Sequence, residues 1–572
     1  MPFTRFKRAS NQKNATDATT DSDHQTTPKR IAIIGSGVSG LTCAHYLGTQ
    51  HDVTVFEAND YIGGHVNTID VALQDGKKAK SSNVESSAID TGFIVFNERT
   101  YPNFFRLLHE LQVPFQATDM SFSVKNTARY FEYNGHTLNT LLSQRKNVLN
   151  PKFWQFIKDI LQFNKHIKQL RQDYDSARSQ GQDVSSFAEQ TLGGYLAQKK
   201  YGQLFTDNYL LPMVSAIWST SLDEVQEFPL VFFAQFFDNH GLLDVVNRPQ
   251  WFTIKGGSKQ YVNKLIPRFI KAGGKIRVNS PVQSVVRDGD QVTLTIQDKG
   301  NANNHSENLV FDEVVFACHA DTVLKILKDA STDESEVLGH FRFTKNTAVL
   351  HTDTSVLPKK PLAWASWNYL IDETVSGSVK DEQASGNAQI PAKPVLTYHM
   401  NILQRLTKKH NYLVTLNPAV DNKSVDDKQI IKSIDYSHPV FDLAMIDAQT
   451  KWSSISGNGS HTHFCGAYWF NGFHEDGVRS GLRVCQALGL DIDIKDEVDL
   501  AHLPDADSAH TPFRYKDLPI KADTKLRRLN KREVTIATTN QELVEYADRL
   551  QSSTADTSQY KKRGLFGRRK TK

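Results

Sequence analysis

Three glycines in the sequence have the spacing of a nucleotide-binding turn. Gly35, Gly37 and Gly40 form GxGxxG after the apolar run at 31–34 and before a helical pattern at 41–47. Gly35 permits a tight turn, Gly37 removes the side chain where a pyrophosphate must approach, and Gly40 lets helix and strand pack closely. The helix that follows presents unpaired N–H groups to the phosphates. Because the motif lies between a strand and a helix, it predicts a dinucleotide cofactor.

A carboxylate and a second pair of glycines narrow the choice of dinucleotide. Glu57 ends the next predicted strand, at 53–56, where its carboxylate can accept hydrogen bonds from the adenosine ribose. It would repel a 2′-phosphate, which argues against NADP. Gly63 and Gly64 offer the pyrophosphate a second close approach to backbone, which favours FAD over NAD. The cofactor contacts predicted in this stretch are Gly35, Ser36, Gly37, Val38, Ser39, Gly40, Glu57, Ala58, Gly63 and Gly64.

The same stretch resembles a known flavoprotein superfamily. Residues 55–65 read VFEANDYIGGH, which is similar to the VxExxxRxGGR of flavin-containing amine oxidases, protoporphyrinogen oxidases and phytoene desaturases. His65 replaces the usual arginine, and its imidazole can still donate a hydrogen bond to phosphate or backbone. The resemblance covers most of residues 30–490 and implies an FAD that is bound without a covalent link.

Three further segments resemble this superfamily in the same order. IDTGFIVFNERTYPNFFRLLHEL places Asp90, Gly92 and Thr100 in a strand and turn near the flavin. KGGSKQYVNKL and IRVNSPVQSVV resemble a glycine turn and a strand whose valine, here Val282, meets the adenine. HFCGAYWFNGFHEDGVRSGLRVCQAL, at 463–488, resembles the C-terminal flavin motif. The resemblance adds the cofactor contacts His65, Thr91, Gly92, Val282, Gly466, Asp476, Gly477 and Val478.

The C-terminal motif predicts a helix whose N-terminus points at the flavin. Asp476 and Gly477 precede VRSGLRVCQALGL. The positive end of this helix would stabilise the negative charge that gathers on the N1/C2 carbonyl side of a flavin after hydride transfer. Ser480 and Gly481 permit close packing of the helix. The predicted catalytic residues, by their place in the motif, are Tyr468, Trp469, His474 and Glu475.

Other chemistry has weaker support in the sequence. His474 is a candidate acid or base, with a purely structural histidine as the alternative. His461 and His463 lack a third ligand at a recognisable spacing, so no metal site is predicted.

Two departures from the amine oxidases bear on the substrate. Gly466-Ala467 stands where that family has Gly-Glu or Gly-Asp, and Phe473 stands where many members have a tyrosine of an aromatic cage. The aromatic runs at 153–163 and 227–237 are typical of a protein core, but two of them in one region make an apolar tunnel plausible.

The segments AWASWNY, TYHMN, YSHPVF and GAYWFNGFHEDGV most resemble bacterial FAD-binding proteins that accompany cyclopropane-fatty-acid synthases. This resemblance implies an FAD-dependent oxidoreductase that oxidises or desaturates a hydrophobic, lipid or fatty-acyl substrate by hydride transfer to flavin N5. A lipid methyltransferase is the implied partner. The alternatives are an amine oxidase, a non-catalytic flavoprotein partner of a lipid-modifying methyltransferase, and an NAD-binding module.

These motifs require an α/β fold with a discontinuous Rossmann-type FAD-binding domain and an inserted α+β substrate domain. The FAD-binding segments are predicted at 30–98, 250–335 and 455–495. The substrate domain is predicted to be helical at 99–249 and sheet-like at 336–454. A disordered tail at 1–29 and a polar extension with a basic end at 496–572 complete the division of the chain.

Composition excludes several other classes of protein. The net charge of +4 over 572 residues does not suggest nucleic acid as a partner. Four cysteines without a CxxC pair indicate a reduced, cytoplasmic setting, and the N-terminus lacks the apolar core of a secretory signal. No run approaches the length of a spanning helix. The end, KKRGLFGRRKTK at 561–572, is typical of a solvated tail; the alternative is peripheral contact with an anionic inner membrane surface.

Overall fold

The computed structural model describes residues 27–74, 84–244, 248–297, 306–372, 395–407, 410–418, 425–495 and 534–537. The tails predicted at 1–29 and 496–572 fall almost wholly outside these residues, as does the basic end at 561–572.

A five-stranded parallel sheet gathers strands from three distant parts of the chain. Its order is β10 (Lys275–Arg277), β2 (Asp52–Phe56), β1 (Arg30–Ile34), β14 (Glu313–Phe316) and β20 (Thr462–Phe464). The central strands are apolar and almost fully buried, as expected where helices cover a parallel sheet. The predicted α/β fold, with a Rossmann-type domain that is discontinuous in the chain, is confirmed.

Helices and a small sheet cover this central sheet. α1 (Val38–Leu47) contacts both α11 (Lys259–Lys271) and α17 (His474–Ala487), and α17 also contacts α2 (Pro102–Glu110). The antiparallel sheet formed by β11 (Val282–Asp288), β12 (Gln291–Gln297) and β13 (Ser306–Phe311) contacts β1 and β14. The strand expected in IRVNSPVQSVV is confirmed as β11, which begins at Val282.

A seven-stranded sheet forms the body of the substrate region. Its order is β19 (Ile430–Pro439), β15 (Phe343–His351), β18 (Leu413–Leu416), β17 (Val395–His399), β16 (Trp367–Ile371), β7 (Phe122–Asn126) and β8 (Phe131–Asn134). β7 and β8 come from the stretch that was expected to be helical, as does β6 (Phe115–Thr118). β7 pairs in parallel with β16, from which it is separated by more than two hundred residues. Local periodicity does not report such long-range pairing.

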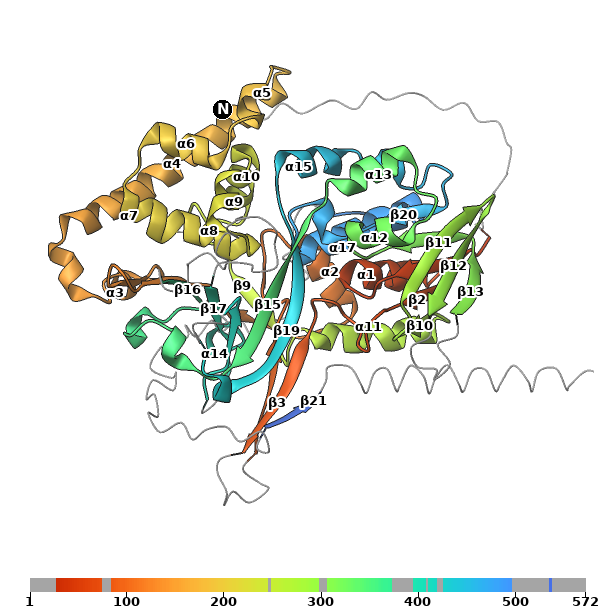
Figure 1. Ribbon diagram of the computed structural model, residues 1–572, viewed down its shortest axis with the longest axis horizontal. Helices are drawn as coiled ribbons and strands as arrows, with labels where there is room; N and C mark the ends of the chain where they lie inside the picture. The colour runs from red at the N-terminus through yellow and green to blue at the C-terminus, as the bar shows by residue number, and fades with distance from the viewer. Residues whose placement is uncertain are drawn as a thin grey trace, which may run out of the picture.

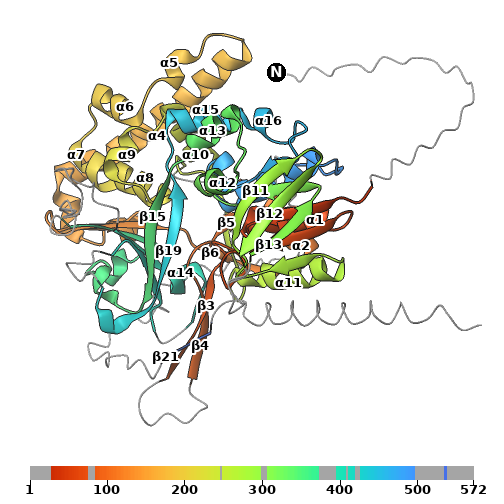
Figure 2. The same cartoon turned by 45° about the vertical axis from the view of Figure 1, so that its right-hand side comes forward.

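A helical lobe packs on one end of this sheet. It contains α3 (Leu138–Leu141), the 3₁₀ helix η2 (Arg145–Leu149), α4 (Pro151–Ser179), α6 (Leu192–Lys199), α8 (Leu211–Trp218) and α10 (Leu230–Asn239). Figures 1 and 2 show the lobe and the five-stranded domain at opposite ends of the molecule, with β15 and β19 between them. Within the described ranges, no helix combines the length and apolar character needed to cross a bilayer.

Candidate functional site

The turn between β1 and α1 has the open backbone that a phosphate group requires. Gly35 has φ +111°, and a Cβ there would lie 2.7 Å from Ala317 O, while a Cβ on Gly40 would lie 2.1 Å from Gly35 O. Gly37 differs, because a Cβ there would meet no protein atom within 4 Å. α1 has no side-chain cap and no acidic residue in its first turn. The first N–H groups of α1 are therefore available to an anionic ligand.

Glu57 and the second pair of glycines are held against the same turn. Ser36 donates to one Glu57 oxygen from its backbone N (3.0 Å) and from its Oγ (2.6 Å), and Asn59 donates to the other oxygen. Gly64 has φ +58°, and a Cβ there would lie 3.1 Å from Gly37 Cα. The two glycine motifs thus touch each other beside a buried carboxylate.

Asp90 joins the predicted flavin-side strand to the second predicted glycine turn. It ends β4 (Val84–Asp90), is fully buried, and accepts hydrogen bonds from Thr68 Oγ1 (2.6 Å), Ser258 N (2.8 Å) and Ser258 Oγ (2.9 Å). Burial raises the pKa of Asp90 to about 6, although these hydrogen bonds act in the opposite direction. Gly257 has φ +90°, and a Cβ there would lie 2.5 Å from Thr68 Cγ2. Asp90 therefore fixes the N-terminus of α11.

α17 crosses α1 where both helices begin. A Cβ on Gly477 would lie 2.4 Å from Val38 Cγ1, and a Cβ on Gly481 would lie 2.8 Å from Ser39 O. The close packing expected at Gly481 is confirmed. Since each N-terminus carries a partial positive charge, the crossing brings two such charges to one side of the five-stranded sheet.

His65 provides a test of whether the site fits the FAD that the sequence implies. Its ring stacks on Tyr436, with 4.8 Å between ring centroids, and lies 5.5 Å from the ring of His438. In the described part of the chain, no group forms a hydrogen bond with the buried Nε2 of His65. Burial, reinforced by His438, His319 and His474, holds the pKa of His65 well below its usual range. A buried imidazole nitrogen without a protein partner, close to two open glycine turns, fits a cofactor at this position.

Two residues of this site, Tyr436 and His438, were not singled out in the sequence. They lie on β19, where Tyr436 Oη is 3.0 Å from Thr91 Oγ1 and Asn346 Nδ2 is 3.0 Å from His438 Nδ1. Burial lowers the pKa of His438 to about 4. The signal that could have identified them is the two-residue spacing in YSHPVF, because residues i and i+2 of a strand share one face.

Further rings come from two other segments. His319 follows β14 and stacks on Phe343 of β15, with 4.2 Å between centroids and 11° between planes. Burial lowers the pKa of His319. Tyr468 lies 5.7 Å from Phe343, edge to face, and its hydroxyl donates to Cys318 O (3.4 Å). We call the group His65, His319, Phe343, Tyr436 and His438 the ring cluster.

Among the predicted catalytic residues, His474 contacts Phe93 and α11, and Glu475 contacts α2. His474 stacks on Phe93 at 3.7 Å, its Nε2 lies 3.0 Å from Tyr261 Oη, and burial lowers its pKa to about 3. Glu475 accepts hydrogen bonds from Asn103 N (3.0 Å), Asn103 Nδ2 (2.7 Å) and Phe104 N (2.8 Å). It therefore caps the first turn of α2. Burial raises the pKa of Glu475 to about 8, against the effect of these donors.

Tyr468 and Trp469 lie near the ring cluster, before α17. Trp469 is buried, packs edge to face on Phe341 at 4.7 Å, and its Nε1 has no hydrogen-bond partner among the described residues. Gly466 N donates to Ser480 Oγ (3.0 Å), which fixes this segment to α17. The catalytic roles assigned to Tyr468, Trp469, His474 and Glu475 remain predictions.

Three further predicted cofactor contacts are Val282, Asp476 and Gly92. Val282 begins β11 close to Ser280, whose backbone N donates to Glu57 O (2.9 Å). Asp476 accepts a hydrogen bond from Phe473 N (2.8 Å) at the N-terminus of α17, and burial raises its pKa to about 7. A Cβ on Gly92 would lie 2.2 Å from His65 O, so this turn requires glycine. Of the residues that the structure describes, no three or more histidine, cysteine or acidic side chains are grouped to hold a metal ion.

Comparison with known proteins gives a family and a fold. Residues 38–393 match the family described as flavin containing amine oxidoreductase. The chain is 52% identical over 42 residues to an L-amino-acid oxidase of Sistrurus catenatus edwardsii, a match that spans 7% of this chain and 8% of that relative.

Two solved structures are similar over most of their length. They are a CLA-producing fatty acid isomerase from P. acnes (TM-score 0.55, 14% identity, 81% of this chain and 100% of that one) and a cyclohexylamine oxidase from Brevibacterium oxydans (TM-score 0.52, 15% identity, 81% and 98%). At these identities the similarity shows the fold.

Proposed function

Because the chain belongs to the flavin containing amine oxidoreductase family and is an FAD-dependent oxidoreductase, we propose that it oxidises or desaturates a hydrophobic substrate, a lipid or fatty-acyl chain. Bound FAD would supply the hydride acceptor for this oxidation. The protein itself supplies the positive N-termini of α1 and α17, the carboxylate of Glu57, and the unpartnered Nε2 of His65.

The observation that carries the proposal is the neutral character of the ring cluster. Burial lowers the pKa of all three of its histidines, so at neutral pH they are uncharged. Its other members, Phe343 and Tyr436, carry no charge either. An alkylammonium ion would therefore find no carboxylate in this cluster, whereas an apolar chain avoids the desolvation of a charge.

A second aromatic group extends from α17 into the helical lobe. Phe473, at the N-terminus of α17, stacks on Phe236 with 4.9 Å between centroids, and Phe232 stacks on Phe441 at 5.1 Å. Trp218 packs on Phe236 at 4.5 Å. These aromatic side chains give the region beside α17 an apolar character, which supports an acyl chain as the substrate. The fold is compatible with both substrate classes, since one similar structure is named for a fatty acid and another for an amine.

The experiment is reduction of the bound flavin without oxygen. The purified full chain with FAD would be mixed anaerobically with a membrane lipid extract or, separately, with polyamines and aromatic amines, while its visible absorption band is followed. We expect the lipid extract to bleach the band and the amines to leave it. Bleaching by amines alone would indicate an amine oxidase. An absorption band that stays unchanged in every mixture would contradict a lipid substrate.

A pair of variants tests whether the ring cluster is the site. His438→Gln should slow bleaching while the flavin content stays constant. His351→Gln is the matched control, because His351 is another buried histidine of the same sheet, on β15, bonded to Thr415 rather than to the cluster. Equal rates for the two variants would place the reaction elsewhere.

A further inference from the structure

The tip of the helical lobe exposes apolar side chains in an unusual concentration. Leu138, Val148, Leu149, Trp154 and Leu161 are 78%, 43%, 88%, 52% and 51% exposed. We call these five residues the lobe tip. Leu222, Val286, Val310 and Leu443, the large apolar side chains exposed on other described elements, are spread over α9 (Leu222–Gln226), β11, β13 and α15 (Leu443–Thr450). Several large apolar side chains exposed on neighbouring elements mark an interaction surface.

Local hydrogen bonds hold the lobe tip together. Trp154 Nε1 donates to Val148 O (2.9 Å), which binds α4 to η2. Arg145 donates to Asn139 O (3.3 Å) and Asn139 Oδ1 (2.6 Å), which binds η2 to α3. Figure 1 shows α3 at the edge of the molecule that is farthest from the five-stranded domain. The tip is therefore a built surface and not a set of unrelated exposed side chains.

α4 has two apolar faces, of which only one is buried. Phe153, Phe156 and Ile167 pack into the lobe. Trp154 and Leu161 lie on the other face, with Lys158 between them at the helical spacing i, i+4, i+7. The core of the lobe thus accounts for the first face and leaves the second without a partner in the described chain.

The exposed charged side chains in the stretch that carries the lobe tip, 135–172, are all basic. Arg145, Lys146, Lys152 and Lys158 are exposed, and in the described residues none of the three lysines pairs with a carboxylate. The only acidic residue from 135 to 172 is Asp159, which is buried and accepts from Gln155 Nε2 (2.8 Å) and Gly202 N (3.1 Å). Lys359 and Lys360, also exposed, precede the short helix η5 (Pro361–Ala363), which contacts α3.

We propose that the lobe tip docks onto the surface of an anionic lipid bilayer. Exposed apolar side chains that include a half-exposed tryptophan, flanked in the chain by lysine and arginine and by no exposed carboxylate from 135 to 172, are complementary to an anionic headgroup layer over acyl chains. The tip would enter only the headgroup region. The proposal stands whether or not the substrate is a lipid, and it places the contact on a different segment from the basic end at 561–572.

Two variants separate the apolar and the basic contribution. Leu138→Ser with Leu149→Ser removes the two most exposed apolar side chains. Lys146→Gln with Lys152→Gln and Lys158→Gln removes the unpaired cations. Val310→Ser with Leu443→Ser is the matched control, because these side chains are 38% and 45% exposed on other elements. An unchanged flavin spectrum and melting temperature in all three would show that each variant is folded.

The measurement is co-sedimentation of the full chain with phosphatidylcholine vesicles that either contain or lack phosphatidylglycerol, at low and high salt. We expect wild-type protein to bind the vesicles with phosphatidylglycerol, and less so at high salt. The leucine pair should lower the partition coefficient about tenfold, since apolar area is lost. The lysine triple should lower it about a hundredfold. The control should bind as wild type does.

Three outcomes would overturn the proposal. The first is that both tip variants bind the vesicles as strongly as wild-type protein does. The second is loss of binding only on deletion of 561–572, which would assign the contact to the tail. The third is that the tip variants bind vesicles as wild type does but have a lower molecular mass in solution than wild type. This would make the tip a contact between copies of the chain.

Discussion

Gly37 and Gly40 belong to one motif, yet the structure gives them different physical roles. A Cβ on Gly40 would collide with Gly35 O, whereas a Cβ on Gly37 would enter open space. Gly37 also has φ −66°, which any residue can adopt. The protein therefore needs glycine at 40 in order to fold, and glycine at 37 only to admit its cofactor.

This difference leads to a prediction for two alanine variants. Gly37→Ala should change the unfolding free energy of the apoprotein by less than about 1 kcal/mol, the scale of an N-cap substitution, but should lower the flavin content of the purified protein. Gly40→Ala should destabilise the apoprotein by about 2–3 kcal/mol, because its Cβ cannot be accommodated. Urea unfolding and the flavin-to-protein absorbance ratio measure the two effects. A Gly37→Ala protein with the flavin content of wild type would show that glycine at this position is not needed to admit the cofactor.

Glu475 makes the stability of the protein depend on pH. Its pKa in the folded protein is raised to about 8, so the folded state binds its proton more tightly than the unfolded state does. The resulting stabilisation is complete below the unfolded pKa and is lost as the pH rises through about 8. Above about pH 6.5, the ordinary pKa of histidine, wild-type protein should therefore lose unfolding free energy up to about pH 8; below that range the buried histidines, whose pKa values are lowered, act in the opposite direction.

Glu475→Gln should reduce this loss by on the order of 1–3 kcal/mol, because glutamine does not ionise. The remaining slope would come from Asp90 and Asp476, whose pKa values are also raised by burial, and, with the opposite sign, from the buried histidines. Urea titrations at the two pH values give the comparison. The same slope in wild type and variant would mean that Glu475 is ionised throughout.

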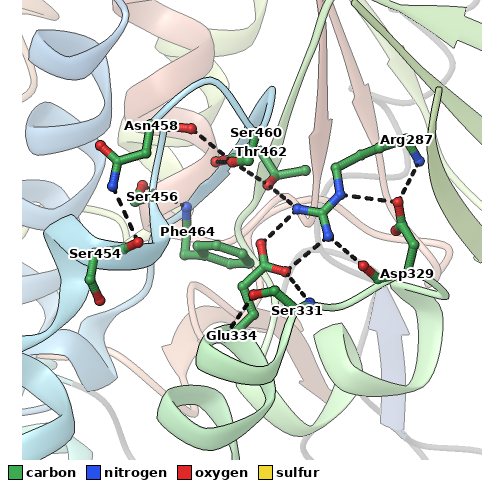
Figure 3. A network of polar contacts seen from close by, with 11 residues as sticks. Arg287, Asp329, Ser331, Glu334, Ser454, Ser456, Asn458, Ser460, Thr462 and Phe464 are labelled. Atoms are coloured by element: carbon green, nitrogen blue, oxygen red, sulfur yellow. Dashed lines mark hydrogen bonds and ion pairs between the residues drawn. The ribbon is translucent and has the colours of Figure 1, made fainter. Parts of the chain in front are cut away.

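At the scale of elements, Arg287 connects three parts of the FAD-binding domain (Figure 3). From β11 it donates to both oxygens of Glu334 (2.8 and 2.9 Å) on α13 (Thr332–Gly339), to Asp329 Oδ2 (3.1 Å), and to Thr462 Oγ1 (3.3 Å) on β20. β20 leads directly to Gly466. The Arg287 network therefore positions both the strand that carries Val282 and the strand that precedes the C-terminal flavin motif.

Removal of Arg287 should destabilise the folded protein. The Glu334 side chain is only 3% exposed, so Arg287→Met would leave a buried carboxylate without its cation and destabilise the protein by roughly 3 kcal/mol. The double variant Arg287→Met with Glu334→Gln should be less destabilised than the single variant. Thermal or urea unfolding measures the stability of both variants. A double variant that is less stable than the single variant would exclude a penalty from the buried charge.

The elements also show which parts of the fold are readable from the chain. β1, α1 and β2 follow one another, and apolar runs separated by a glycine turn were sufficient to predict them. β7 and β8 were missed because their stability comes from pairing with β16, far along the chain. The aromatic run at 153–163 is typical of a protein core, yet Leu161 within it is half exposed, because the pattern does not say where the lobe ends.

At the scale of the whole molecule, the site is assembled where the five-stranded domain meets the seven-stranded sheet. The cofactor half of this site could be predicted, since each of its turns carries a local glycine motif. The substrate half could not, because Tyr436 and His438 reach His65 only through the packing of β19 against the FAD-binding domain. Their two-residue spacing places both on one face of a strand, but it does not show that this face meets His65.

The most direct test of the account is the mass of the acyl chains that the protein has processed. The full chain with FAD would be incubated with a membrane lipid extract and a suitable electron acceptor, and the fatty acids would then be analysed by mass spectrometry. The account predicts acyl chains that have lost one hydrogen pair for each flavin that is reduced. Unaltered lipids, together with flavin reduction by an amine, would contradict it.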